Sequence, residues 1–464
     1  MIAALALLAL PIFIVILRQS QTRRYQAFVA IGLLPLLSDW PLIGYVYGWP
    51  TWSGISKGFS LSFVVMLAVA LIHTNKRKIS GIPFAWIFIL YAIAVIISVL
   101  NSRMYLASLF TLWQYLSVVT VFLAICLEAD NPKVYRSILT GFAFGLIYQS
   151  GHVIWLKLNG VGQAAGTLGH QNLLGIGVEL TMLPVLAAVL AGDRRPVMFA
   201  GLVAGLICIA GTGSRGTVGI GGGAAIILIF LSLARRPDRR KFGLATVCVL
   251  AVAIAAPFAL GNLKTRFQDT SFFTTETERE LFEDAARSMA NNNPLGVGAN
   301  QYVFVSNVEG YADRFGIPWQ LADRSVPVHN GYLLARAETG RLGEWAFIIA
   351  IFLPLFAALK IAVIDRKSLT GDLLIGSAMA LVAVAAHSFY EFGLHLFPLQ
   401  LLFYMNLGLI AAEVRARRYK LPGKALRRVQ GSCASERSMP VPSVYGHGAG
   451  VISNYLEHHQ RHSA

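Results

Sequence analysis

An arginine and a histidine that could act together in a reaction lie in one polar stretch of the chain, residues 261–341. Arg279 shortly precedes the sequence AsnProLeuGlyValGly (Asn293–Gly298), and His329 stands in ValHisAsnGlyTyrLeu (Val328–Leu333). A guanidinium can hold an anionic group by charge-assisted hydrogen bonds, and an imidazole can take a proton from a sugar hydroxyl near neutral pH. We therefore predict that both are catalytic residues.

A second arginine, Arg215, lies in the glycine-rich segment GlyThrGlySerArgGlyThr (Gly211–Thr217). Small residues on both sides let backbone amides approach a ligand and cup an anion. The alternative is a long side chain that reaches lipid phosphate from a helix end. The segment alone leaves both interpretations open, and we include Arg215 among the predicted catalytic residues.

Further polar residues are candidates for substrate binding. His170 and Asn172, in GlyThrLeuGlyHisGlnAsnLeuLeuGly (Gly166–Gly175), could bond to sugar or phosphate oxygens, although His170 could equally be only a helix cap. Glu179, inside the apolar segment that follows, is an intramembrane acid and so a functional candidate. Glu391 and His395 occupy a short turn near the end of the chain, and we predict that Glu391 binds substrate.

A helix is expected over Thr275 to Ala290 to carry Arg279. Thr275 and Glu278 have capping-box spacing, and one face is apolar: Leu281, Phe282, Ala285, Ala286 and Met289. The opposite face carries Arg279, Glu283 and Arg287 at four-residue steps, typical of a surface salt-bridge ladder. Arg287 is nevertheless retained as a candidate for substrate binding.

Pro294 should end this helix, because proline lacks a backbone donor and restricts the residue before it. Gly296 and Gly298 follow in a tight turn, which is either structural or allows close backbone approach to a glycan or phosphate. We predict that both glycines, and Asn330 beside His329, contact substrate. A short helix, Tyr332 to Glu338, should follow.

The composition defines the class of protein. The chain is 56% hydrophobic and only 13% charged, whereas soluble domains have about 25% charged residues. An all-α polytopic membrane protein is predicted. The net charge of +16 does not indicate nucleic-acid binding, because the basic residues lie in short loops between apolar segments. The four cysteines form no CxxC or Cys/His cluster, so neither a metal site nor a cofactor is predicted.

Apolar segments long enough to cross a bilayer predict 12 or 13 transmembrane helices, at residues 2–17, 26–45, 59–73, 83–100, 106–127, 136–157, 173–191, 197–211, 217–234, 242–260, 342–363, 372–389 and 396–413. The first should be a retained span, since no positive region or cleavage site accompanies it. The predicted domains are a bundle (1–260), a catalytic loop (261–341), further spans (342–413) and a basic tail (414–464), disordered beyond about Leu421.

Basic residues in alternate connections give the orientation. One set of connections holds seventeen: Arg18, Arg23, Arg24, Lys76, Arg77, Lys78, Lys133, Arg136, Arg194, Arg195, Arg235, Arg236, Arg239, Arg240, Lys241, Arg366 and Lys367. The opposite short connections hold four: Lys57, Arg103, Lys157 and Arg215. Because basic loops stay in the cytoplasm, the tail should be cytoplasmic and residues 261–341 should face outward, which is the periplasm if the protein lies in the inner membrane of a bacterium with two membranes.

The sequence resembles the O-antigen ligase and polymerase superfamily of bacterial membrane glycosyltransferases. The resemblance rests on GlySerArgGly at Arg215, on Arg279 before AsnProLeuGlyValGly, on HisAsnGlyTyrLeu at His329, and on GlyHisGlnAsn at His170. It is specific over about residues 165–345. Phe282 departs from the family, which often has tryptophan there, and the first span is extra, since ligases usually have twelve.

The resemblance implies a metal-independent, inverting transfer of a glycan from undecaprenyl diphosphate to a hydroxyl. Arg215 and Arg279 would stabilise the departing diphosphate, and His329 would activate or orient the acceptor, most simply a lipid A core sugar. The alternatives within the family are a polymerase, whose acceptor is another lipid-linked glycan, and a protein O-oligosaccharyltransferase. An alternative of another class is a lipid-linked glycan transporter or flippase.

Overall fold

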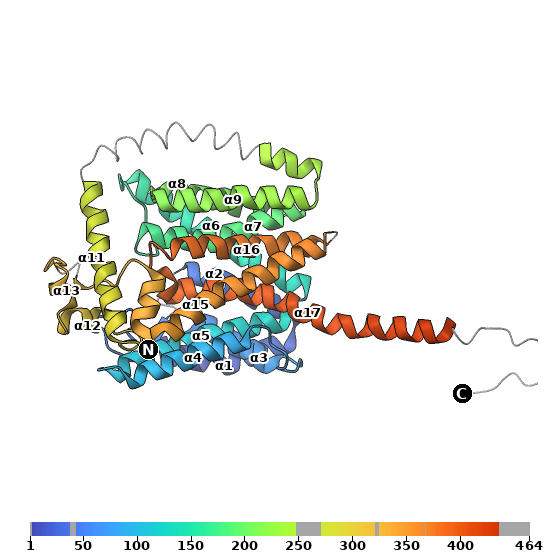
Figure 1. Cartoon of the computed structure of the whole chain (residues 1–464). Coiled ribbons are helices and arrows are strands. Elements are labelled where there is room, and N and C mark those ends of the chain that lie inside the picture. The colour runs from blue at the N-terminus through green and yellow to red at the C-terminus, as the bar shows by residue number, and fades with distance from the viewer. Residues whose placement is uncertain (1, 38–42, 247–270, 321–323, 367, 436–464) are drawn as a thin grey trace, which may run out of the picture. The chain divides into compact units, whose positions relative to one another are not determined.

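The structure, a computed structural model, describes residues 2–37, 43–246, 271–320, 324–366 and 368–435 (Figure 1). The predicted fold class is confirmed: the chain is 76% helical and 3% strand, an all-α polytopic membrane protein. Residues 1–416 form one compact unit and residues 417–464 a second. The following description concerns the first unit unless stated otherwise.

The helices of the bundle mostly coincide with the predicted spans. They are α1 (Ile2–Gln19), α2 (Gln21–Leu33), α3 (Phe63–Thr74), α4 (Ala85–Leu100), α5 (Tyr105–Glu128), α6 (Pro132–Leu158), α7 (Gln171–Ala191), α8 (Pro196–Thr212), α9 (Arg215–Arg235), α15 (Gly331–Ile364), α16 (Leu369–His387) and α17 (Phe397–Ser435). Within the described residues, α5, α7, α9, α15, α16 and α17 are long and apolar enough to cross a membrane, and α1, α3, α4 and α8 are shorter apolar helices. The number of spans stays a prediction, and most of segment 242–260 lies outside the described residues.

A β-hairpin replaces part of two predicted spans. Strand β1 (Ile43–Gly48) pairs antiparallel with β2 (Gly58–Ser62), so the prediction of one helix over 26–45 is wrong in its second half. Helix α2 ends at Leu33, and Pro35 lies in a 3-10 turn, η1 (Leu34–Leu36), where its missing N–H costs nothing. Helix α3 then begins only after Ser62, whose side chain caps it by accepting from the Val64 amide.

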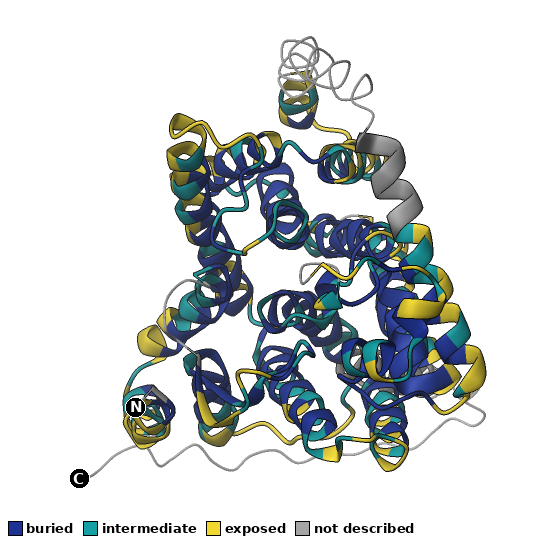
Figure 2. Ribbon diagram, turned by 90° about the vertical axis from the view of Figure 1, so that its left-hand side faces the viewer, coloured by how far each residue is buried: buried dark blue, intermediate teal, exposed yellow. Residues whose placement is uncertain are grey.

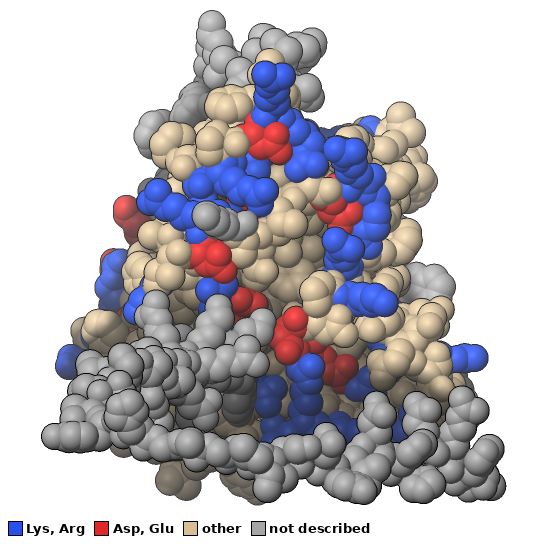
Figure 3. Space-filling view, turned by 90° about the vertical axis from the view of Figure 1, so that its right-hand side faces the viewer, with Lys and Arg blue, Asp and Glu red and all other residues tan. Residues whose placement is uncertain are grey.

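The two ends of the bundle differ in character. Helices α11 (Ser271–Asn292), α12 (Tyr302–Val308) and α13 (Tyr311–Arg314) lie beyond the helix ends on one side, at the left of Figure 1. We call this the loop end. At the other end α1 stops and α2, α6 and α8 start, and lysines and arginines gather over it (Figure 3). We call it the basic end.

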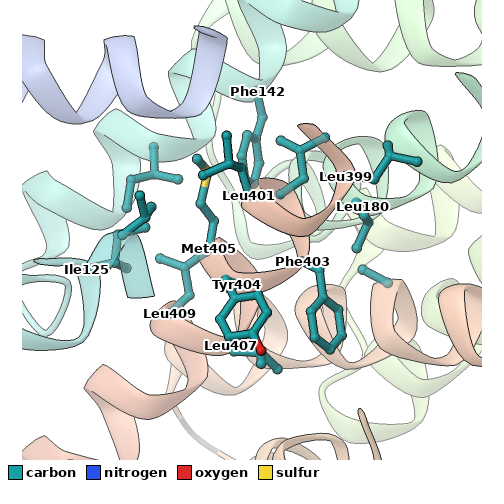
Figure 4. Close-up of a cluster of buried hydrophobic side chains, with 14 of the residues drawn as sticks. Ile125, Phe142, Leu180, Leu399, Leu401, Phe403, Tyr404, Met405, Leu407 and Leu409 are labelled. Atoms are coloured by element: carbon teal, nitrogen blue, oxygen red, sulfur yellow. The ribbon is translucent and has the colours of Figure 1, made fainter. Parts of the chain in front are cut away.

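The core of the bundle is built around the first half of α17. In α7, all residues from Leu174 to Leu190 are buried, and buried faces of neighbouring helices are turned toward one another when the bundle is viewed from the loop end (Figure 2). Figure 4 shows the α17 side chains packed against α5, α6 and α7: Leu399, Leu401, Phe403, Tyr404, Met405, Leu407 and Leu409 with Ile125, Phe142 and Leu180. Close packing of this kind holds these helices in fixed positions relative to one another.

Buried ion pairs fasten the basic end. Asp372 of α16 is 1% exposed and lies 2.9 Å from Arg235 Nη1 of α9 and 3.1 Å from Lys241 Nζ. Arg24 of α2 pairs with Glu128 at the end of α5. Some basic residues at this end therefore join helices through buried ion pairs, while others give the surface its positive charge.

The polar stretch forms its own small core at the loop end. The predicted apolar face of α11 is confirmed, because Phe282, Ala285, Ala286 and Met289 are buried in a cluster with residues of α12, α13 and α15. The capping-box prediction is wrong, because α11 already begins at Ser271, so Thr275 stands inside the helix. In the second unit α17 continues to Ser435, where disorder was predicted beyond about Leu421, and residues 436–464 lie outside the described part.

Candidate functional site

The His329 imidazole faces a buried carboxylate. His329 Nδ1 lies 3.3 Å from Glu391 Oε2, and the side chains are 28% and 2% exposed. The position of Glu391 is set by the turn after α16, in which the Glu391 amide donates to the His387 carbonyl at 2.8 Å. His329 is thus oriented by a carboxylate while its ring remains accessible, an arrangement suited to a general base.

Glu391 also connects His329 to the start of α7. Its other oxygen, Oε1, accepts a hydrogen bond from Asn172 Nδ2. His170 precedes α7 and caps it, because its Nδ1 accepts from the Asn172 amide at 3.3 Å. Three residues predicted from distant parts of the sequence, Asn172, His329 and Glu391, are therefore in direct contact, with His170 beside them.

Electrostatic interactions extend this group to Arg279. Burial lowers the pKa of His170 below its ordinary value; Glu391 opposes this shift, and the positive charges of His329 and Arg279 reinforce it. Burial alone would raise the pKa of Glu391. The pKa is lowered overall by interactions with His329, by the hydrogen bond from Asn172 and by the interaction with His170. Arg279, half-buried on α11, is thus close enough for its charge to act on His170.

Helix α11 is fixed to the His329 segment one turn beyond Arg279. The Phe282 ring meets the His329 ring edge-on at 6.5 Å between centroids, and Glu283 Oε1 accepts from Asn330 Nδ2 at 3.2 Å. Phe282, the residue at which the sequence departs from the family it resembles, therefore supports the imidazole directly.

Asn330 is fully engaged within the protein. Its Oδ1 caps α15 by accepting from the amides of Tyr332 and Leu333 at 3.1 Å, while its amide nitrogen donates to Glu283. Both ends of the side chain join α11 to α15, which gives Asn330 a positioning role. Its contact with substrate stays a prediction.

Arg287 forms the salt-bridge ladder that the spacing on α11 indicated. It is exposed, and its guanidinium pairs with Glu283 four residues before it and with Asp284, 2.8 Å away, three residues before it. Both pairs lie on the surface of one helix, so the prediction that Arg287 binds substrate finds no support in its geometry.

Gly296 and Gly298 approach the protein's own backbone. Their φ angles are 83° and 104°, and a Cβ atom would lie 2.3 Å from Glu338 O at Gly296 and 2.3 Å from Ser102 Cβ at Gly298. The Gly298 amide donates to Glu338 O at 3.0 Å. Both glycines are buried, and this turn packs against α15 beside the kink at Gly340. Their contact with substrate stays a prediction.

Arg215 begins α9 beside the start of α7. Ser214 caps α9 by accepting from the Thr217 amide at 3.2 Å, and Arg215 is half-buried in the first turn. Gly175 of α7 packs against Thr217, and a Cβ there would lie 2.1 Å from Thr217 Oγ1. The close approach of these two helix starts puts Arg215 on the same end of the bundle as His170.

Two further histidines, the buried His387 and the half-buried His395, were not predicted with their partners. His387 Nε2 lies 3.0 Å from Glu179 Oε1, so the intramembrane acid is paired across α7 and α16. His395 Nε2 lies 3.2 Å from the Gly331 carbonyl and its ring stacks on Phe347, and burial lowers its pKa to about 4 although the Gly331 bond opposes this. His387 accepts a hydrogen bond from the Glu391 amide through its carbonyl, and His395 contacts Gly331 next to Asn330. Neither pairing has a local sequence signal.

Fold and site define a multi-pass membrane protein with a polar site of histidine, carboxylate and arginine where its helices end. A family model described as O-antigen ligase matches residues 200–348, which contain Arg215, Arg279 and His329. The predicted resemblance to the O-antigen ligase and polymerase superfamily is confirmed over these residues. No curated protein matches the chain.

Proposed function

We propose that this protein is an O-antigen ligase-like glycosyltransferase that moves a glycan from undecaprenyl diphosphate to an acceptor hydroxyl. The observation that carries the proposal is the His329–Glu391 pair, in which His329 Nδ1 lies 3.3 Å from Glu391 Oε2, and Arg279 acts electrostatically on the nearby His170. Transfer from a diphosphate carrier to an alcohol requires a base for the alcohol and positive charge for the leaving diphosphate. The family match supports the reaction class.

His329 takes the proton of the acceptor hydroxyl on its Nε2 atom, while Nδ1 stays bonded to Glu391. The acceptor oxygen then bonds to the anomeric carbon of the glycan, and the bond from that carbon to the diphosphate oxygen breaks. The electron pair leaves with undecaprenyl diphosphate, whose added negative charge Arg279 and Arg215 stabilise. Attack opposite to the leaving group inverts the anomeric centre.

We infer that the basic end faces the cytoplasm and the loop end the periplasm, in the bacterial inner membrane. The concentration of lysine and arginine at the basic end supports this orientation (Figure 3). The donor would then reach the site from the outer leaflet, with its polyprenyl chain in the bilayer and its diphosphate at the level of Arg279.

We propose a lipid A core sugar as the acceptor. A deletion strain tests it. A ligase predicts that lipid-linked polymer accumulates unattached to lipopolysaccharide, and plasmid-borne wild type should restore attachment.

Each other outcome of the deletion contradicts that choice of acceptor. Accumulation of single lipid-linked repeat units would indicate a polymerase, and unmodified exported protein would indicate a protein O-oligosaccharyltransferase. Normal surface glycans and normal glycoproteins would overturn the proposed function altogether.

A further inference from the structure

Two neighbouring histidines at the loop end are bound by different kinds of partner. His170 Nδ1 accepts a hydrogen bond from the Asn172 backbone amide at 3.3 Å. An amide nitrogen can only donate, so Nδ1 of His170 must offer its lone pair. The proton of the neutral His170 ring is therefore on Nε2, and His170 presents a donor to its surroundings.

His329 has the opposite arrangement. Its Nδ1 faces Glu391 Oε2, and the other oxygen of that carboxylate already accepts from Asn172 Nδ2. An ionised carboxylate has lone pairs only, and the interactions with His329 and Asn172 lower the pKa of Glu391 despite its burial. The His329 proton is therefore on Nδ1, and its Nε2 presents a lone pair.

We propose that His170 is a substrate-binding residue whose Nε2–H donates a hydrogen bond to a phosphate oxygen of the diphosphate leaving group, while His329 alone can accept the proton of the acceptor hydroxyl. The inference rests on the proposed function and divides its chemistry between the two rings. The proton and the leaving group then never compete for one imidazole.

The charges around His170 favour phosphate as its ligand. Arg279, on α11, is near enough to act on the ring, and the ring stands at the start of α7, whose first amides and positive dipole end attract anions. Arg215 begins α9 beside that same helix start. A neutral donor adds a hydrogen bond to this anion site without placing another positive charge beside Arg279.

Burial, with the charges of His329 and Arg279, keeps the pKa of His170 low although Glu391 opposes the shift. A lowered pKa favours the neutral ring, which is the form that donates through Nε2. Glu391, His329 and Arg279 are the titratable and charged groups that act on it.

Two substitutions separate the donor from the helix cap. In His170→Asn the amide oxygen can replace Nδ1 as the cap, but no N–H reaches the former Nε2 position. In His170→Gln the amide N–H can reach that position, but the cap is lost. We expect His170→Asn to keep the thermal stability of wild type and lose about tenfold to a hundredfold in kcat/KM, as for a hydrogen bond to a charged group. His170→Gln should be less stable and lose less activity.

The reverse order would overturn the inference: an active His170→Asn and an inactive His170→Gln would mean that His170 is only a cap. The pH–rate profile gives a second readout with purified wild type, lipid-linked glycan donor and acceptor in nanodiscs. The acidic limb should persist in both variants, and its loss in His170→Asn would make His170 the base.

Nitrogen NMR of histidine-labelled protein tests the proton positions without any transfer reaction. His170 should show the Nε2–H form and His329 the Nδ1–H form, assigned by the signals that His170→Asn and His329→Asn remove. An Nδ1–H signal at His170 overturns the inference even if the enzyme is active. A wild type with these proton positions and no glycan transfer would instead contradict the proposed function.

Discussion

The two ends of the helix bundle use charged residues in opposite ways. At the basic end, Asp372 is closed between Arg235 and Lys241, and all three side chains are at most 5% exposed. At the loop end, Glu391 is equally buried, yet its partner His329 is 28% exposed and keeps one ring nitrogen for other contacts. The Asp372 cluster is enclosed on all sides, whereas the His329–Glu391 pair leaves part of the imidazole at the surface.

The difference shows how burial separates charged groups that stabilise the fold from those that can react. A fully enclosed ion pair is costly to break, but it has no accessible atom that could bind a substrate. A buried carboxylate that holds an accessible imidazole directs the free nitrogen outward, where a substrate can meet it. The comparison predicts that substitutions at the loop end change the reaction, whereas substitutions at the basic end change only stability.

The largest expected effect is at Arg279. Arg279→Ala should reduce glycan transfer at least a hundredfold, typical of removing a group that stabilises developing charge, with membrane expression unchanged. Arg287→Ala, on the same helix, is the matched control and should transfer almost normally, because Arg287 pairs with Glu283 and Asp284. Transfer would be measured with lipid-linked donor. Equal effects of the two substitutions would remove Arg279 from the site.

Replacing the carboxylate that orients His329 should have the next largest effect. In Glu391→Gln the new amide can donate to Nδ1, which puts the His329 proton on Nε2 and removes the base; we expect kcat to fall about 10²- to 10⁴-fold. The sign of the pKa shift adds a stability test. Because the folded-state pKa of Glu391 is lowered, its stabilisation is present above the ordinary carboxyl pKa and is lost as pH falls through the folded value.

Thermal unfolding of wild type should therefore lose this contribution on acidification, whereas Glu391→Gln should not. Retention of normal kcat by Glu391→Gln would contradict the orienting role. Asn172→Ala is the control for the other oxygen: it removes one donor to Glu391 but leaves the contact with His329, so its kcat should fall less.

A smaller effect is expected where α11 joins the His329 segment. Asn330→Asp can still cap α15, but it places a carboxylate against Glu283 in place of the 3.2 Å hydrogen bond, so transfer should fall about tenfold, as for loss of a positioning contact. The double substitution Glu283→Gln, Asn330→Asp restores a donor and an acceptor with their positions exchanged. Rates for the four proteins form a double-mutant cycle, and recovery in the double variant supports the contact. A double variant no better than Asn330→Asp would argue against it.

The smallest effect on the reaction is expected at the basic end. Asp372→Asn leaves Arg235 and Lys241 without their carboxylate, which should cost about 3–5 kcal/mol of stability and lower the unfolding temperature. Transfer per folded molecule should match wild type, with the same pH profile. A changed pH profile would mean that the two ends are coupled and that the comparison drawn above is wrong.

The sequence by itself determined the class of protein, the positions of most helices and which residue types are candidates for the site. Long apolar runs form helices in a bilayer, because the bilayer core has no water to bond the backbone N–H and C=O groups. The spacing of Phe282, Ala285, Ala286 and Met289 predicted the buried face of α11. The hairpin at Ile43–Ser62 escaped prediction because apolar, aromatic runs suit strands and helices alike.

Only the tertiary structure decided which polar residues act together. His170, Asn172 and Glu391 lie outside the residues that match the family, and Glu391 is 62 residues from His329, yet α7 and the turn after α16 bring them into contact. The same packing brings Gly296 and Gly298 against neighbouring residues of the chain, joins Asn330 to Glu283 and leaves Arg287 on the helix surface. Residue types specify what a side chain can do, but helix packing across long sequence separations determines what it meets.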